Sequence, residues 1–437
     1  MRGHTFAWLV IGRRTVARKA VMVGALWGCL VALGIPVSWA AGGQPVGSLW
    51  SRPRGDSANT AYANGVASAY KLLWQVPWLI NGPTSVDIDG DSIYANEGSA
   101  VFCLSTANGQ ARWSRSLSNP AVPLGAQYRC TGITIAGARV LIGVSSASGP
   151  GIVYALNKST GAVEWSDQFP GQILSTPVVW DDRILVRAGF DVILIDASKG
   201  FELSSTPMPG PQTDMATKSG DPATDGQAIY FNSDLGEAFC VDPPSTLRWV
   251  SDTAGIVRTG AFPFIRASVK VTSCAPMLDG SRILAADGAS NCYAFDCKTG
   301  SRLWAAATDG IVYQFARNAD SCFAATSSGF YRLDSQTGHL TPLFSDHGGV
   351  LWCAVSDRYA VLAPTWNATG GLVVIDVRSD KEVWADKDFY VRSPVAVSSR
   401  VIFAVGTNGR APNGPGYLRA YTPVYTPVFH TPSPLTQ

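Results

Sequence analysis

Gly151 to Trp165 reads Gly-Ile-Val-Tyr-Ala-Leu-Asn-Lys-Ser-Thr-Gly-Ala-Val-Glu-Trp, and this stretch decides the fold. The run 152–156 is apolar with alternating large and small side chains, which predicts a β-strand. The segment that follows ends at Gly161 and predicts a tight turn, because glycine takes a positive φ without a steric penalty. A second short strand then ends at Trp165. The stretch is therefore interpreted as a β-hairpin that closes on a tryptophan.

The same hairpin recurs along the chain. Further copies that keep the tryptophan cover 101–113, 237–249, 291–304 and 372–384. Two more copies keep the hairpin but carry Ser204 and Pro342 in place of the tryptophan. One unit repeated along a chain at such spacing indicates a repeat architecture.

Each copy follows an earlier apolar hairpin whose turn is Asp-Gly, as at Asp89-Gly90 and Asp279-Gly280, or a related pair. Each unit therefore contains four short strands. The units cover 85–114, 132–166, 175–205, 221–250, 273–306, 313–344, 352–386 and 393–423. The last unit lacks its closing strand, and the isolated strand at 70–77, with Trp74, supplies it. The sequence predicts an all-β, eight-bladed β-propeller of four-stranded antiparallel blades, closed by pairing of its N- and C-terminal strands.

The segments outside the propeller differ in composition. Residues 1–40 carry basic residues, then an uncharged apolar run and small residues, which predicts a signal peptide cleaved after Ala40 and a periplasmic or secreted protein. The alternative is that this segment is an uncleaved membrane anchor. The sequence also leaves open whether the signal is of the general secretory or the twin-arginine type. An irregular lead-in is expected at 41–69, the propeller at 70–422, and a disordered Thr/Pro-rich tail at 423–437.

The charge and cysteine content narrow the classes of function. The chain has 34 basic and 32 acidic residues, and removal of 1–40 with its five basic residues leaves 29 and 32, a net charge of −3. A balanced surface gives no reason to expect nucleic-acid binding. Loss of Cys29 with the signal reduces nine cysteines to eight, so disulfides are permitted but their pairing cannot be deduced.

The pattern Ala-Leu-Asn-x-x-Thr-Gly-x-x-x-Trp at 155–165, and its close match at 294–304, resemble the tryptophan-docking motif of pyrroloquinoline-quinone-type β-propellers. The lead-in at 54–62 is also similar to the start of such chains. The resemblance implies that each tryptophan packs against the alanine and the Thr-Gly turn of a neighbouring blade. The residues it places in this role are Trp74, Trp113, Trp165, Trp249, Trp304 and Trp384.

The resembled family includes quinoprotein dehydrogenases as well as non-catalytic relatives, such as the propeller lipoprotein of the outer-membrane β-barrel assembly machinery. Many of the dehydrogenases carry a vicinal disulfide against the quinone, and this chain has no Cys-Cys pair. We therefore expect an exported, monomeric, non-catalytic binding or scaffolding module without cofactor, which contacts other envelope proteins through its rim loops. The alternatives are a dehydrogenase that depends on pyrroloquinoline quinone with Ca²⁺, and a carbohydrate-binding propeller.

Residues that enter the innermost strands are expected to ring one mouth of the central channel. The candidates are Arg129, Lys218, Tyr313, Trp352 and Arg392. Cations and aromatic rings without an acid fit a small anionic or sugar ligand, whereas the alternative is a set of solvated loop residues. No metal site is expected, because the histidines lack ligand spacing and the acidic run at 87–91 is interpreted as a hairpin turn. Asp214 and Arg258, on long connections, are the remaining candidates for a catalytic group.

Overall fold

The computed structural model describes residues 55–424, except 57, 81–83, 118–127, 147–149, 174, 190, 208–220, 233–237, 243–245, 252–256, 259–273, 346–347, 366–370, 399 and 410–413. The chain divides into two units, Met1–Gly43 and Gln44–Gln437, and the described residues all belong to the second. The described residues contain only strands, turns and loops, so no helix among them is long and apolar enough to cross a membrane.

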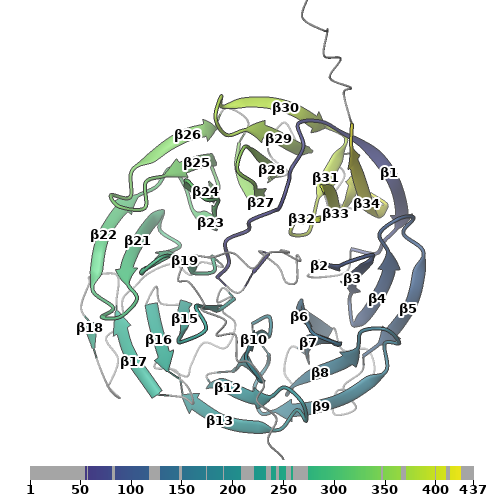
Figure 1. Cartoon of the computed structure of the whole chain (residues 1–437), viewed down its shortest axis with the longest axis vertical. Coiled ribbons are helices and arrows are strands. Elements are labelled where there is room, and N and C mark those ends of the chain that lie inside the picture. Colours follow the sequence, from purple (N-terminus) through teal and green to yellow (C-terminus); the bar gives the residue numbers. More distant parts are fainter. Residues whose placement is uncertain are drawn as a thin grey trace, which may run out of the picture. The chain divides into compact units, whose positions relative to one another are not determined.

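Eight antiparallel sheets stand around a central axis as the blades of one ring (Figure 1). Blade 1 contains β2 (Val86–Asp89), β3 (Ser92–Glu97), β4 (Ala100–Ser105) and β5 (Ala111–Ser116). Blade 2 contains β6 (Tyr128–Ala136), β7 (Arg139–Ser146), β8 (Gly151–Asn157) and β9 (Val163–Phe169). Blade 3 contains β10 (Val178–Trp180), β11 (Arg183–Ala188), β12 (Asp191–Asp196) and β13 (Glu202–Pro207). Blade 4 contains β14 (Ala223–Thr224), β15 (Ile229–Asn232), β16 (Ala238–Asp242), β17 (Thr246–Ser251) and a short fifth strand, β18 (Val257–Arg258).

The second half of the ring repeats this arrangement. Blade 5 contains β19 (Met277–Asp279), β20 (Arg282–Ala286), β21 (Asn291–Asp296) and β22 (Arg302–Ala307). Blade 6 contains β23 (Val312–Arg317), β24 (Cys322–Thr326), β25 (Gly329–Leu333) and β26 (Leu340–Phe344). Blade 7 contains β27 (Val350–Val355), β28 (Tyr359–Pro364), β29 (Leu372–Asp376) and β30 (Lys381–Asp386). Blade 8 contains β31 (Phe389–Val391), β32 (Ala396–Ser398), β33 (Val401–Asn408), β34 (Gly416–Pro423) and β1 (Tyr70–Pro77).

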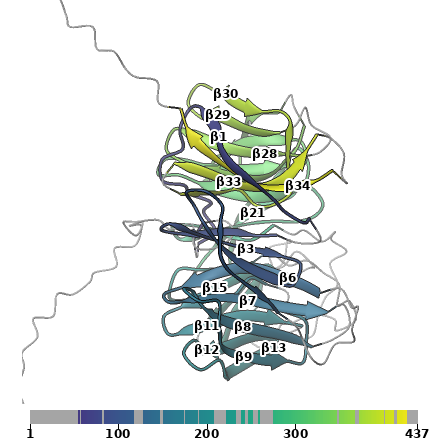
Figure 2. The ribbon, with the colours of Figure 1, turned by 90° about the vertical axis from the view of Figure 1, so that its right-hand side faces the viewer.

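The pairing of β1 with β34 closes the ring. Trp74 lies opposite Ala420 and Gln75 lies opposite Arg419, and Figure 2, which views the ring from its rim, shows the two strands side by side. The predicted eight-bladed propeller and its closure are confirmed. Two blades depart from four strands, because blade 4 adds β18 and the innermost strand of blade 8 is split into β31 and β32, which both pair with β33.

Burial follows the position of a strand within its blade. The third strands are almost fully buried, as in β8, because both faces of the sheet pack against neighbouring blades. The fourth strands alternate between exposed and half-buried residues, as in β22, because one face points to solvent at the rim. The eight described cysteines are all buried and form no disulfide with one another, and most lie within these packed faces.

The lead-in runs across the inner strands at one end of the channel (the dark purple trace in Figure 1). The backbone of Ala58 accepts a hydrogen bond from Leu278 in blade 5, and Thr60 accepts one from Arg317 in blade 6. Tyr62 then forms a parallel bridge with Val355 in blade 7. The lead-in therefore links the inner ends of several blades at the face that carries the first hairpin turn of each blade.

Asn59 is the anchor of the lead-in. Its buried side-chain nitrogen donates to the carbonyl of Pro276 at 2.8 Å and lies 3.2 Å from that of Asp221. Its φ of 59° suits asparagine better than most residues. We expect Asn59→Ala to lower the free energy of unfolding by about 2 kcal/mol, because buried carbonyls lose their donor. Thermal unfolding followed by circular dichroism measures this, with exposed Asn108→Ala as the control; equal effects of both substitutions would contradict it.

Candidate functional site

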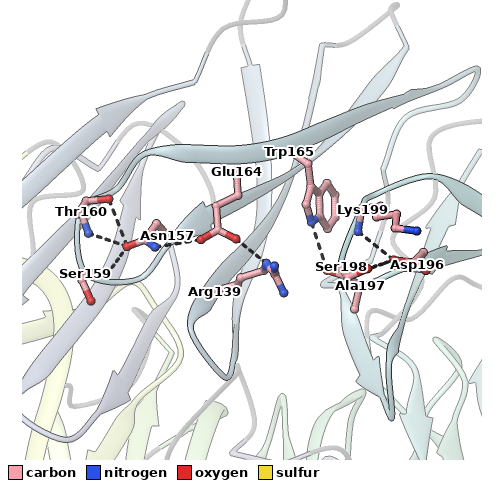
Figure 3. A network of polar contacts seen from close by, with 10 residues as sticks. All are labelled: Arg139, Asn157, Ser159, Thr160, Glu164, Trp165, Asp196, Ala197, Ser198 and Lys199. Carbon is pink, nitrogen blue, oxygen red and sulfur yellow. Dashed lines mark hydrogen bonds and ion pairs between the residues drawn. The ribbon is translucent and has the colours of Figure 1, made fainter. Parts of the chain in front are cut away.

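The tryptophan at the end of each hairpin lies at the contact between two neighbouring blades, which we call a joint. At joint 2/3, the indole nitrogen of Trp165 donates to the carbonyl of Ala197 at 3.2 Å (Figure 3). Gly200 in the same turn has a φ of +81°, and a Cβ there would lie 2.4 Å from the indole ring. Only glycine therefore lets the ring lie flat on the turn.

The turn that receives the indole is shaped by its own side chains. A carboxylate oxygen of Asp196 accepts hydrogen bonds from the backbone nitrogens of Ser198 and Lys199, both at 2.9 Å (Figure 3). The Ser198 hydroxyl also donates to Asp196, and this bond together with the backbone amides lowers the pKa of the carboxyl. The carboxylate fixes the turn in a conformation that presents the Ala197 carbonyl to the neighbouring blade.

Four other joints show the same contact. The indole nitrogens donate to the first carbonyl of the next turn in the pairs Trp74–Thr106 (2.8 Å), Trp113–Lys158 (3.0 Å), Trp249–Cys297 (3.1 Å) and Trp304–Ser335 (2.9 Å). A glycine faces the indole in each of these turns, at Gly109, Gly161, Gly300 and Gly338. The docking geometry thus recurs at joints 8/1, 1/2, 4/5 and 5/6.

Joint 7/8 differs, because the closing blade has no turn between its third and fourth strands. Trp384 instead lies edge-on to Tyr70 and to Tyr421, with ring centroids 5.6 Å apart in both pairs. Beside them, the Arg419 guanidinium donates to a carboxylate oxygen of Asp386 in blade 7 at 2.9 Å. Aromatic edges and one ion pair therefore replace the turn at this joint.

Joints 3/4 and 6/7 lack the rim tryptophan. At joint 3/4, Ser204 stands in its place, and Trp180 on the innermost strand donates its indole nitrogen to the carbonyl of Gly226 in blade 4 at 2.6 Å. At joint 6/7, Pro342 stands in its place, and the Arg332 side chain donates to the carbonyl of Val377 in blade 7. Each of these joints therefore has a substitute donor.

The residues predicted to ring the channel mouth are only partly described. Lys218 and the catalytic candidate Asp214 lie outside the described residues, and so do the side chains of Arg129 on β6 and of the second catalytic candidate, Arg258 on β18. Tyr313 on β23 and Trp352 on β27 are half-buried, and Arg392 follows β31, where its backbone nitrogen donates to Val405 at 2.7 Å. No hydrogen bond, ion pair or ring contact of the described residues joins these three side chains.

The inner strands explain why Tyr313 and Trp352 do not occupy equivalent positions. A bulge in β23 falls on Tyr313, whereas the bulge in β27 falls on Leu351. Trp352 is therefore in register with Gln314 rather than with Tyr313, and its ring packs against the hydrophobic core. The ligand ring stays a prediction for these positions.

A polar cavity of about 410 Å³ opens beside blade 6. Its walls carry the charged residues Asp279, Arg317, Asp320, Arg332 and Asp334, together with His339. Arg317 pairs with Asp279 at 3.2 Å, and Asp334 accepts the backbone nitrogen of Gln336 within its own turn at 2.8 Å. Among the described residues, no group of three or more His, Cys, Asp or Glu side chains could hold a metal ion. The charged walls fit the binding of polar groups.

A family model described as outer membrane protein assembly factor BamB matches residues 129–341, which hold the docked turns of blades 2, 3, 5 and 6. The chain is a pyrroloquinoline-quinone-like β-propeller. The propeller is 24% identical over 327 residues to the outer membrane protein assembly factor BamB of Yersinia pestis, covering 73% of this chain and 75% of that protein.

Solved structures share the fold of this propeller. BamB from Moraxella catarrhalis superposes with a TM-score of 0.58 at 14% identity, over 81% of this chain and 99% of that one. A europium-containing methanol dehydrogenase superposes with a TM-score of 0.61 at 12% identity, over 86% of this chain and 98% of that one. Identities this low show the fold alone, and the same fold serves both a dehydrogenase and an assembly factor.

Two of the contacts described here were not anticipated from the sequence. Neither of the substitute donors, Trp180 and Arg332, stands at the tryptophan position of the docking motif. For Arg332 a signal was present, because it stands at the alanine position of the motif in the same hairpin that loses its tryptophan to Pro342. For Trp180 no comparable signal exists, because it lies on the innermost strand, outside the hairpin that carries the motif.

Proposed function

We propose that this chain is an exported, non-catalytic propeller that binds other envelope proteins and supports the assembly of outer-membrane proteins. The observation that carries the proposal is the match to the assembly factor of Yersinia pestis across about three quarters of both chains. The family model drawn from the same class of protein supports it. On this proposal the signal at 1–40 is removed, and the mature protein works in the periplasm as a monomer.

The lead-in favours one face of the ring for partner binding. Neighbouring strands are antiparallel, so the first and third turns of every blade lie on one face and the connections between blades lie on the other. The lead-in occupies the channel end at the first of these faces, where it pairs with Val355 and contacts Arg317. We therefore assign partner binding to the opposite face.

The charged groups of the covered face support this assignment, because many of them are already paired within the ring. Lys158 of blade 2 bonds Asp89 of blade 1, and Arg317 of blade 6 bonds Asp279 of blade 5. Paired charges that bridge neighbouring blades hold the ring together rather than offer free groups to a substrate. The proposal accordingly assigns no catalytic residue.

The proposal is tested by blocking one face at a time. All eight described cysteines are buried, so an added exposed cysteine is labelled selectively. We expect a bulky thiol label on Lys387→Cys, in the connection between blades 7 and 8, to reduce capture of outer-membrane assembly proteins about tenfold. The label blocks contacts at one edge of the proposed interface, and a tenfold loss corresponds to about 1.4 kcal/mol of binding free energy. The same label on Asp182→Cys, in the first turn of blade 3 on the opposite face, is the matched control; its side chain is 88% exposed.

Loss of the gene gives a second test. The proposal expects lower amounts of β-barrel proteins in the outer membrane, restored by the wild-type chain. Unchanged amounts of barrel proteins in the deletion strain would contradict an assembly role.

Calorimetric titration of residues 41–437 with pyrroloquinoline quinone and Ca²⁺ distinguishes the proposal from the enzyme alternative. Binding of the quinone, with dye reduction on addition of alcohols or sugars, would replace the proposal with a dehydrogenase.

A further inference from the structure

At joint 6/7, all three residue positions that form the docking contact carry a different residue type. In the docked joints, an alanine or a cysteine on the third strand lies opposite the tryptophan, and a glycine in the next turn lies under the indole, as Ala155 and Gly200 do for Trp165. At joint 6/7 the corresponding residues are Arg332, Pro342 and Asp380. Three coordinated replacements indicate a different contact rather than a damaged one.

The replacement of glycine by Asp380 is consistent with the loss of the tryptophan at this joint. Asp380 has a φ of 56°, and its backbone nitrogen bonds the carbonyl of Asp376 at 2.9 Å, so the turn keeps the shape that Gly161 gives to blade 2. At Gly161 a Cβ would lie 2.5 Å from the ring of Trp113. Because no indole lies on the blade 7 turn, a side chain is tolerated there.

The Arg332 side chain takes over the role of the indole. It donates to the carbonyl of Val377, which is the first carbonyl of the turn and the acceptor used in the docked joints. A guanidinium nitrogen also lies 3.8 Å from a carboxylate oxygen of Asp380. We call these three groups the latch: the Arg332 guanidinium, the Val377 carbonyl and the Asp380 carboxylate.

The latch is open to solvent, unlike a docked indole. The side chains of Arg332 and Asp380 are 38% and 48% exposed. Arg332 also lines the polar cavity of about 410 Å³, so water and ions reach the guanidinium from that side. An exposed ion pair is screened by salt, whereas an indole packed on a turn is not.

The inner end of the same joint is fixed by buried contacts. The side-chain amide of Gln314 donates to the carbonyl of Cys353 at 3.0 Å and accepts from the backbone nitrogen of Cys353 at 3.0 Å. Asn318 donates to the carbonyl of Ser356 at 3.1 Å. Both side chains are buried, and Figure 1 places β23 and β27, which carry Gln314 and Cys353, near the axis while β26 and β30 lie at the rim.

We propose that joint 6/7 is a hinge of the ring, held at its inner end by Gln314 and Asn318 and closed at its rim by the latch. Screening of the Arg332–Asp380 pair releases the rim end, while the inner end keeps the two blades together. Among the described residues, a docked indole closes the rim of five other joints, and an aromatic seam with the largely buried Arg419–Asp386 pair closes that of joint 7/8. Joint 3/4 is bridged at its innermost strand by Trp180. The latch, with its exposed ion pair, is therefore the rim contact that we expect to respond most strongly to ionic strength.

Hydrogen exchange measured by mass spectrometry on the whole protein tests the hinge. Between 0.05 and 1 M NaCl the Debye length falls from about 14 Å to about 3 Å, and we expect the turn at 376–380 and strand β26 to exchange about fivefold faster. The turn at 334–338, on which Trp304 docks, is expected to be unchanged. An equal acceleration at both turns would overturn the proposal, because the response would then not be specific to the latch.

Variants assign the response to the latch. Arg332→Ala is expected to show the fast exchange at both salt concentrations, and Asp380→Asn is expected to lose the salt response while it keeps the bond to Val377. Arg282→Ala is the matched control, because Arg282 also crosses a joint, to Gln336, but that joint keeps its tryptophan. Wild-type exchange in Arg332→Ala, or a full salt response in Asp380→Asn, would refute the latch.

Discussion

Replacement of Trp249 by alanine is expected to lower the free energy of unfolding by about 3–5 kcal/mol, the range for a large aromatic side chain removed from a core. Trp249 is the most deeply buried of the docking tryptophans, with 1% of its surface exposed. Its indole contacts Gly300 and donates to the carbonyl of Cys297, so the substitution leaves a cavity and an unsatisfied acceptor at joint 4/5. Urea unfolding followed by circular dichroism measures the loss.

Two further variants separate the causes. Trp249→Phe keeps most of the ring but loses the N–H donor, and we expect a smaller loss of about 1–2 kcal/mol. Trp165→Ala removes an indole that is half-buried, and its effect should lie below that of Trp249→Ala because less apolar surface leaves the core. If Trp165→Ala and Trp249→Ala are equally costly, burial does not set the strength of a joint.

Replacement of Arg419 by alanine is expected to lower the free energy of unfolding by about 3 kcal/mol, because it breaks a largely buried ion pair. Arg419 lies on β34 and is 9% exposed. Its guanidinium bonds Asp386 of blade 7 at 2.9 Å and Gln75 of β1 at 3.1 Å, and it lies 4.3 Å from the ring centre of Phe389. One side chain thus connects blade 7 to both chain ends of the closing blade.

The control for Arg419 is Arg378→Ala, which removes an arginine of the same charge from an exposed turn of blade 7. We expect that change to stay within about 0.5 kcal/mol. Thermal unfolding of both variants at one protein concentration gives the comparison. A loss at Arg419 no larger than at Arg378 would show that the ion pair does not hold the ring closed.

The architecture was predictable because its evidence is local and repeated. In each hairpin, alternating apolar residues predict the strands and glycine predicts the turn. Blade 8 lacks a closing strand of its own, and the isolated strand that holds Trp74 is the segment that can supply it. The docking of Trp165 on the turn of blade 3 agrees with what the resemblance to the tryptophan-docking motif implies, and spacing alone would not have predicted it.

The substitute contacts were not predictable by the same means. Arg332 and Asp380 lie in neighbouring blades and are far apart in the sequence, and no local sequence pattern predicts that their side chains meet. The channel-mouth positions were mismatched for a related reason: β23 and β27 each carry a one-residue bulge, at Tyr313 and at Leu351, so that Trp352 is equivalent to Gln314 rather than to Tyr313. Single-residue irregularities of this kind are set by packing between strands rather than by composition.

The pairing of β1 with β34 has a consequence for the order in which the protein forms. Gln75 and Arg419 are 344 residues apart in the chain, so the first strand to be synthesised waits for the last before it has a partner. Until then β1 has an unpaired edge next to Leu72 and Leu73, which are exposed even in the closed ring, and this edge is a site for misassociation during export. The blades in between form from neighbouring strands, and closure by such distant strands is therefore expected to be the slow step of folding.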